Sequence, residues 1–102
     1  MSVVPILAAL GDECRLQIVT KLCNAGPQSI SRLADGARIS RQAVTKHLHA
    51  LHKAGLVQSR RRGREHIWNL ETSRIDEVRR YLEKISLQWD DALARLRSVV
   101  ED

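Results

Sequence analysis

Aromatic residues are scarce in this sequence: there is no Phe, and the three aromatic side chains are Trp68, Tyr81 and Trp89. So few rings cannot form the stacking platform with which proteins bind single-stranded RNA. No run of about 18 apolar residues occurs, which argues against a transmembrane helix. The first residues lack a basic region ahead of an apolar core, so we expect no signal peptide, no membrane attachment and a cytoplasmic location.

The patterns of an enzyme are missing as well. No glycine-rich phosphate-binding loop occurs, and the serines fall in expected helix caps or helices instead of beside a base and an orienting acid. We therefore expect no catalytic residue and no cofactor.

Cysteine is limited to Cys14 and Cys23, which lie in one expected helix. Their sequence separation places them on different sides of that helix and about 13 Å apart along its axis. They therefore cannot form a disulfide with each other. Buried, reduced thiols are the favoured interpretation, and the alternative is a redox-responsive protein that uses Cys14 and Cys23 to form a bond between subunits.

Positive charge is concentrated in the first 70 residues, although the formal net charge of the whole chain is +5. Residues 1–70 contain 11 Lys and Arg against 4 Asp and Glu, whereas residues 71–102 contain 6 against 8. The basic body predicts a polyanionic partner, and the mildly acidic end indicates a separate task. With 102 residues the chain forms one small domain, to which a partner subunit would add stability.

Capping residues and glycines divide the first half of the chain into four expected helices. Asp12, Ser29 and Ser40 can each cap the start of a helix, and Gly11, Gly36 and Gly55 follow the ends of three of them. The expected ranges are 4–10, 12–24, 29–35 and 40–54. In the second helix the side chains expected to face inward are Leu16, Val19, Leu22 and Cys23.

After Gly55 the periodicity changes and predicts a β-hairpin. One short strand opens at Leu56, and the second spans residues 65–70. Between them Gly63 can adopt the positive φ that a hairpin turn needs. Four arginines surround this glycine, and their mutual repulsion would be relieved by a polyanion such as DNA, whose minor groove favours arginine.

The third and fourth expected helices, joined by a short turn, match the helix-turn-helix pattern of DNA-binding proteins. In the fourth helix Val44, Leu48 and Leu51 form one apolar stripe, which we take to face inward. The opposite side can then enter the major groove, where glutamine pairs with adenine, arginine with guanine and lysine with phosphates. The residues expected to contact DNA are Ser40, Arg41, Gln42, Thr45, Lys46, His49, Arg60, Arg61, Arg62 and Arg64.

Three histidines, His47, His49 and His52, crowd the fourth helix and raise the question of a metal site. His47 and His49 differ by about 200° around the helix, so they cannot share one ion. His49 and His52 could share a face, but they would supply fewer ligands than zinc sites take. We expect no metal site within this helix and interpret His47 as a half-buried structural residue.

No Gly or Pro occurs from Thr72 to Asp102, and apolar residues recur there at alternating steps of three and four. This heptad pattern predicts one helix with a continuous apolar seam. At about 42 Å the helix is too long for the preceding residues to cover, so we expect a second copy to cover it. The alternatives are a helix folded onto its own domain and a protein-interaction module that does not bind DNA. The seam residues are Ile75, Val78, Leu82, Ile85, Trp89, Ala92, Leu96 and Val99, widened by Leu93 and Val100.

Together these segments resemble the ArsR/SmtB family of small dimeric winged-helix repressors. The resemblance covers LAALGDECRLQIVTKL (7–22) and SISRLADGARISRQAVTKHLHALHKAGLVQSRRRGREHIWNL (29–70), and SRQAVTKHLHALHKAGLV with the arginine-rich hairpin is its most specific part. It implies a mainly α fold with a small β-hairpin, a winged helix-turn-helix. In this single domain of residues 1–102, the implied parts are the helix-turn-helix (29–54), the wing hairpin (56–70) and the C-terminal dimerisation helix (72–100).

The family also implies a homodimer, built from the first and last helices, that represses transcription from an inverted-repeat operator until a signal releases it. Within that dimer, residues 40–54 would form the recognition helix and residues 58–67 the wing. The implied interface residues are Val4, Leu7, Ile75, Val78, Leu82, Ile85, Trp89, Leu93 and Leu96.

The sequence departs from the family at the positions where its metal sensors bind their ions. Ser29-Ile30-Ser31 stand where arsenic and cadmium sensors have Cys-Val-Cys. Residues 71–102 contain neither His nor Cys, although zinc sensors use histidines on the last helix. The resemblance is therefore to the metal-independent branch of the family. We expect no metal site, and the sequence leaves the signal open, including any small-molecule effector.

Overall fold

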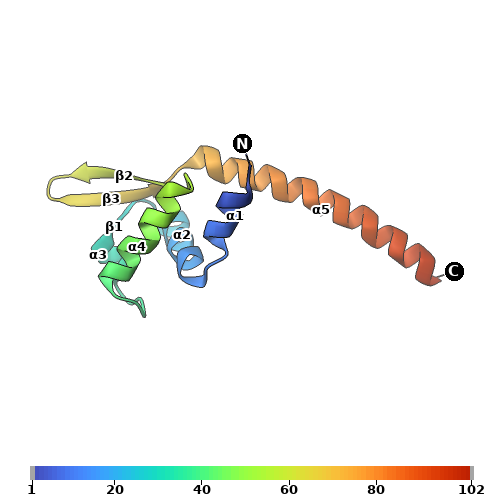
Figure 1. The fold of residues 1–102 in the computed structure, drawn as a ribbon, viewed down its shortest axis with the longest axis horizontal. Coiled ribbons are helices and arrows are strands. Elements are labelled where there is room, and N and C mark those ends of the chain that lie inside the picture. The colour runs from blue at the N-terminus through green and yellow to red at the C-terminus, as the bar shows by residue number, and fades with distance from the viewer. Residues whose placement is uncertain (1, 102) are drawn as a thin grey trace.

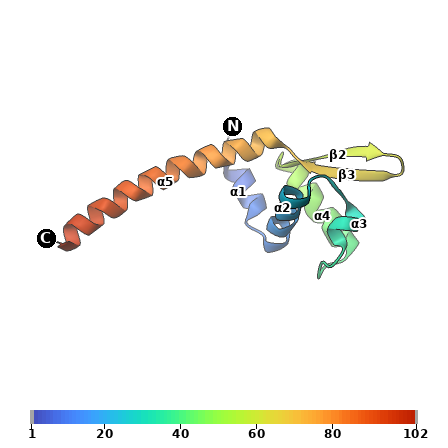
Figure 2. The same cartoon turned by 180° about the vertical axis from the view of Figure 1, so that it is seen from behind.

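The computed structural model describes residues 2–101, which form five helices and three strands (Figure 1). Helices α1 to α4 and the short strand β1 pack into one body. The β2–β3 hairpin and helix α5 project from this body in opposite directions, as both views show (Figures 1 and 2). The elements are α1 (Val4–Leu10), α2 (Glu13–Ala25), β1 (Gln28–Ser29), α3 (Ile30–Ala34), α4 (Arg41–Lys53), β2 (Val57–Arg62), β3 (Glu65–Leu70) and α5 (Thr72–Glu101).

The three expected capping residues begin three of the four helices of the body, α2, α3 and α4. The Asp12 carboxylate accepts a hydrogen bond from the backbone N–H of Arg15 (3.0 Å). The hydroxyl oxygens of Ser29 and Ser40 accept corresponding bonds from the third residue beyond them (3.3 and 3.1 Å). Each bond satisfies an amide that the helix itself leaves unpaired. The expected starts of α2, α3 and α4 are therefore confirmed.

A small antiparallel sheet in the order β1-β3-β2 supports the hairpin. The Arg62↔Glu65 pair closes a two-residue turn in which Gly63 has φ +64°, the positive value that the sequence predicted. A glycine at the first turn position is what a type II′ hairpin requires. Strand β1 was not expected: its two residues pair with β3 through Gln28↔Trp68 and Ser29↔Ile67. It turns the expected hairpin into a three-stranded sheet.

The core is built around α4, whose Val44, Leu48 and Leu51 are each 0% exposed. The stripe predicted to face inward is thus confirmed. Trp68 closes the core from the side of the sheet, and Val78 closes it from the start of α5. The remaining buried apolar residues are Ile6, Ala9, Ile18, Val19, Leu22, Leu33, Leu56 and Val57.

Helix α2 buries two of the four residues expected to face inward, Val19 and Leu22, but not the other two. Ile18, Val19 and Leu22 are buried, whereas Leu16 is 49% exposed and Cys23 is exposed. At about 100° per residue, Leu16 and Cys23 lie roughly a quarter turn or more from the centre of the buried face. The prediction of two buried thiols is therefore wrong: Cys23 is exposed and Cys14 is half-buried.

Helix α5 is a single helix of 30 residues that leaves the body after its first two turns. Val78 is buried and Ile75 packs against the core, but the seam beyond them is open to solvent, with Leu82 50% and Leu96 61% exposed. The alternative of a helix folded onto its own domain is therefore wrong. None of the helices in the described part of the chain combines the length and apolar composition needed to cross a bilayer.

Replacing a residue of the α4 stripe tests the importance of this packing. We expect Leu51→Ala to lower the free energy of unfolding by about 2–5 kcal/mol, because it leaves a cavity in the core. Leu87→Ala, at a position 68% exposed on α5, should change it by no more than about 0.5 kcal/mol. Urea denaturation at one fixed protein concentration measures both. Equal effects would contradict the central place of α4 in the core.

Candidate nucleic-acid interface

The exposed side of α4 carries the polar residues that the sequence placed there. Gln42, Lys46 and His49 are exposed, and Lys53 extends the same side toward the end of the helix. Thr45 is half-buried, and its hydroxyl donates a hydrogen bond to the backbone oxygen of Arg41 (2.9 Å). Because that hydroxyl hydrogen is engaged within the helix, Thr45 offers a DNA base its methyl group and an acceptor oxygen.

Two further expected contact residues lie at the start of α4. Arg41 is exposed, and Ser40 is exposed while its hydroxyl oxygen caps the helix. The backbone amides of this first helical turn point outward and favour a negatively charged partner. No acidic residue lies in the first turn of α4 to oppose such a partner.

The hairpin arginines do not form a single cluster. Arg60, Arg61 and Arg62 lie on β2, where successive side chains point to opposite faces of the sheet. Arg61 lies on the face that carries Trp68, and Arg60 and Arg62 lie on the other face. Within the described residues, none of the hairpin arginines forms an ion pair with a carboxylate. The Nε of Arg61 donates a hydrogen bond to the backbone oxygen of Gly63 (3.3 Å). Its other guanidinium N–H groups, and those of Arg60, Arg62 and Arg64, can bind an external anion.

The start of α4 and the tip of the hairpin share one surface. Arg41 and Arg64 both line a recess of about 190 Å³. Its other lining residues are Ser29, Ile30, Ser31, Glu65 and His66. One arginine from the first turn of α4 and one from the hairpin turn therefore border the same recess, beside the carboxylate of Glu65. Between Ser40 and His66 the sequence has seven Lys and Arg residues and one acidic residue.

The histidines of α4 divide between two environments. His49 and His52 lie edge-on to the Trp68 ring, with ring centroids 6.0 and 6.4 Å from its centroid. His47 is half-buried, as expected, and lies on the side of α4 that faces the start of α2. There it meets Asp12 and Cys14, whose ligand atoms and its own all lie within 4.8 Å of one another.

The Asp12–Cys14–His47 group was not predicted, because only residues close to the histidines in the sequence were considered as further metal ligands. Cys14 and His47 are 33 positions apart, and only the packing of α2 on α4 brings them together. The backbone hydrogen bond from Arg15 holds the pKa of the Asp12 carboxyl below its usual range, and the nearby positive charge of the Arg15 guanidinium acts in the same direction. The carboxylate is therefore ionised near neutral pH.

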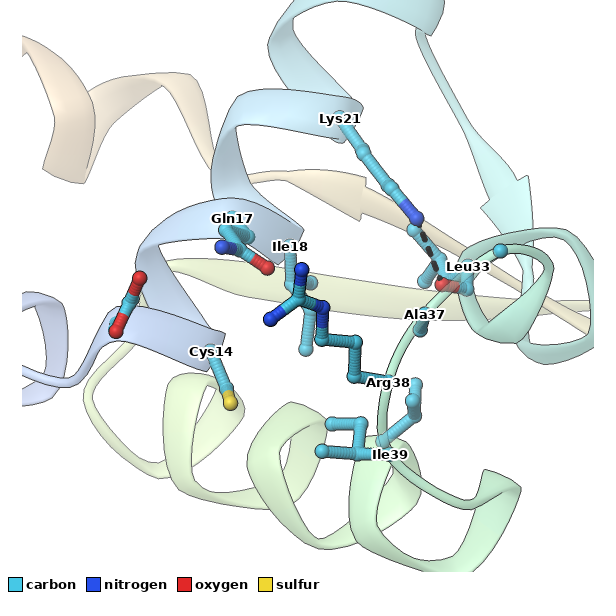
Figure 3. Close-up of a pocket in the computed structure, with 11 residues that line it drawn as sticks. Cys14, Gln17, Ile18, Lys21, Leu33, Ala37, Arg38 and Ile39 are labelled. Carbon is cyan, nitrogen blue, oxygen red and sulfur yellow. Dashed lines mark hydrogen bonds between the residues drawn. The ribbon is translucent and has the colours of Figure 1, made fainter.

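A cavity of about 450 Å³ lies between α2 and the turn that joins α3 to α4 (Figure 3). Cys14 and Gln17 line it from α2, and Arg38 and Ile39 line it from the turn. The ammonium group of Lys21 donates hydrogen bonds to the backbone oxygens of Leu33 (3.2 Å) and Asp35 (3.4 Å) and so ties α2 to the end of α3. Cys14 therefore lines this cavity and also belongs to the group of Asp12, Cys14 and His47.

Comparison with known proteins gives consistent results. A family model described as "Bacterial regulatory protein, arsR family" matches residues 12–59. The HTH-type transcriptional regulator Rv2034 of Mycobacterium tuberculosis is 31% identical over 93 residues, which are 91% of this chain and 83% of that protein. An uncharacterized HTH-type transcriptional regulator of Methanocaldococcus jannaschii, MJ1325, is 26% identical over 80 residues, 78% of this chain and 90% of that protein.

The solved structure of an ArsR-like transcriptional regulator from Rhodococcus sp. RHA1 superimposes with a TM-score of 0.73 and 41% identity. The match covers 93% of this chain and 89% of that one. A winged helix-turn-helix with a small antiparallel sheet is therefore the fold of this chain, as the sequence predicted.

Proposed function

Because the chain belongs to the arsR family of bacterial regulatory proteins, we propose that it is a homodimeric repressor that reads an inverted-repeat operator. Members of this family are DNA-binding transcriptional regulators, not enzymes. The observation that carries the proposal is the outward side of α4, which is polar and basic and continues onto the hairpin. A protein-interaction module that does not bind DNA would leave this polar and basic surface without a role.

The proposed division of labour on DNA follows from the chemistry of each side chain. Gln42 can donate to and accept from adenine in the major groove, and Arg41 can reach guanine or a phosphate. Lys46 and Lys53 suit phosphates, for which a point charge suffices. The hairpin arginines suit the adjacent minor groove, where the negative potential favours guanidinium groups.

The apolar seam of α5 supports the proposed dimer. A contiguous exposed apolar strip of this length marks an interaction surface, and heptad spacing fits the same seam of a second copy. Val4 of α1 is exposed beside it, Leu7 and Ile75 pack partly against their own core at its edge, and Val78, expected in the interface, is buried in that core. In such a dimer the two copies of α4 would read half-sites about 34–36 Å apart. Occupying them would block access of the polymerase to the promoter.

Removing the amide of Gln42 should weaken specific binding. We expect Gln42→Ala to cost about 1–3 kcal/mol on a duplex recovered by its affinity from random sequences, with the loss confined to one base position per half-site. Fluorescence anisotropy on duplexes substituted one base pair at a time measures this. An unchanged affinity and base preference would exclude Gln42 from the reading surface.

Removing a hairpin arginine should have a different signature. We expect Arg64→Ala to weaken binding to all duplexes about equally and to lower the salt slope of log K by about 1 for each phosphate that the guanidinium neutralised. Lys84→Ala removes the same charge from an exposed position of α5 and serves as the matched control. If the two variants lose the same amount of affinity, only net charge matters and the hairpin has no specific place on DNA.

Charge placed in the seam should dissociate the dimer. Burying a leucine contributes about 1.5–3 kcal/mol, so Leu82→Glu in both copies should raise the dimer dissociation constant by more than about 100-fold. Leu87→Glu introduces the same charge on the opposite side of α5. Sedimentation equilibrium should find Leu82→Glu monomeric and Leu87→Glu dimeric at micromolar concentration. A wild-type protein that sediments as a monomer would contradict the proposed dimer.

A further inference from the structure

Asp12, Cys14 and His47 bring three kinds of metal ligand together where α2 meets α4. A carboxylate oxygen, a thiol sulfur and an imidazole nitrogen lie within 4.8 Å of one another. All three residues are half-buried, so that the group is partly screened from water yet reachable from it. We propose that these residues bind a zinc ion and thereby join the start of α2 to the middle of α4.

The distances suit an ion of this size. Zinc binds sulfur at about 2.3 Å and nitrogen or oxygen at about 2.0–2.2 Å in a tetrahedral arrangement. Ligand atoms around such an ion are roughly 3.3–3.7 Å apart, as these bond lengths and the tetrahedral angle require. The separations here, at most 4.8 Å, exceed this range by no more than about 1 Å, a gap that modest side-chain rotations would close.

The backbone already holds the ligands in position. Asp12 is fixed as the cap of α2, where its Oδ1 accepts a hydrogen bond from the backbone amide of Arg15. Cys14 follows in the first turn of the same helix. His47 precedes the fully buried Leu48, so the backbone of α4 at this point is anchored in the core. The guanidinium of Arg15 donates a hydrogen bond to the backbone oxygen of Ala9 (2.6 Å), which holds the start of α2 against α1.

The ligand chemistry selects the metal. A thiolate and an imidazole favour zinc over the hard cations magnesium and calcium, which prefer sites made of oxygen alone. On binding, the Cys14 thiol transfers its proton to the solvent and the sulfur becomes a thiolate ligand, while His47 binds as the neutral imidazole. Three protein ligands leave the fourth tetrahedral position to a water molecule. A zinc ion bound here would contradict the expectation, drawn from the sequence, that the protein has no metal site.

Cobalt(II) is a suitable probe, because it takes the same ligands as zinc and a cobalt–thiolate bond gives a strong charge-transfer absorption. Titration of the untagged, reduced full-length protein with cobalt should produce this absorption, and added zinc should abolish it. Cys14→Ser should remove the absorption. His47→Gln and Asp12→Asn should weaken binding by about 10–100-fold or more, at least as much as loss of an outer-shell partner of a metal site.

The chain supplies matched controls for each type of ligand. Cys23→Ser removes the other thiol of α2, and His52→Gln removes an exposed imidazole of α4 that lies against Trp68. Both variants should bind cobalt as the unchanged protein does. Asp12→Asn keeps a side chain that can cap α2, so its loss of affinity reports the ligand and not the fold, as circular dichroism can verify.

Three results would overturn the site. The first is a wild-type protein that shows no cobalt–thiolate absorption at saturating cobalt. The second is an absorption that survives Cys14→Ser or disappears in Cys23→Ser. The third is equal cobalt affinity in His47→Gln and His52→Gln. Because none of these measurements involves DNA, failure of the metal site would leave the proposed repressor intact, and failure of DNA binding would leave the metal site intact.

Discussion

The burial of one stripe of α4 is the constraint on which the rest of the structure depends. Val44, Leu48 and Leu51 have no contact with solvent, and a helix with one side fixed in a core has its opposite side fixed outward. The packing that stabilises the fold therefore also turns the polar side with Gln42 and Lys46, the proposed DNA-reading surface, outward. His47, at the border of the stripe, is directed toward α2 for the same reason.

Strand β1 links the hairpin to the helix-turn-helix. Its two residues pair with β3, and its second residue, Ser29, is also the capping residue of α3. The orientation of the hairpin is thus coupled to α3 through one buried residue, whose backbone pairs with β3 and whose hydroxyl caps the helix. Ser29 stands where the family's arsenic and cadmium sensors have a thiolate, and in this chain its oxygen is used by the helix cap. The side chains that could bind a metal, Asp12, Cys14 and His47, come together elsewhere, between α2 and α4.

Much of the fold could be predicted because its signals are local. Asp12, Ser29 and Ser40 mark helix starts by their own hydrogen bonds, and Gly63 marks the turn by its backbone angle. The heptad pattern of α5 likewise needs no knowledge of its neighbours. Strand β1 was not predicted, because two residues are too few to show the alternation of polar and apolar side chains that marks a strand. It is a strand only through its pairing with β3.

Features that depend on tertiary packing were predicted poorly. On α2 the burial of Val19 and Leu22 was predicted correctly, but Leu16 was expected inside in place of Ile18, because both are apolar and only the neighbouring helices decide which is buried. The hairpin arginines form one run in the sequence, yet the pleat of β2 divides them between two faces. The group of Asp12, Cys14 and His47 had no signal in the sequence, since 33 positions separate its thiol from its imidazole.

Selecting bound duplexes from a random pool and sequencing them shows whether α4 and the hairpin of two copies read duplex DNA. A dimer that reads DNA in this way should enrich an inverted repeat whose half-site centres are about one helical turn, 10–10.5 base pairs, apart. A pool that stays random after repeated selection, or that yields a single unpaired half-site, would contradict this mode of binding.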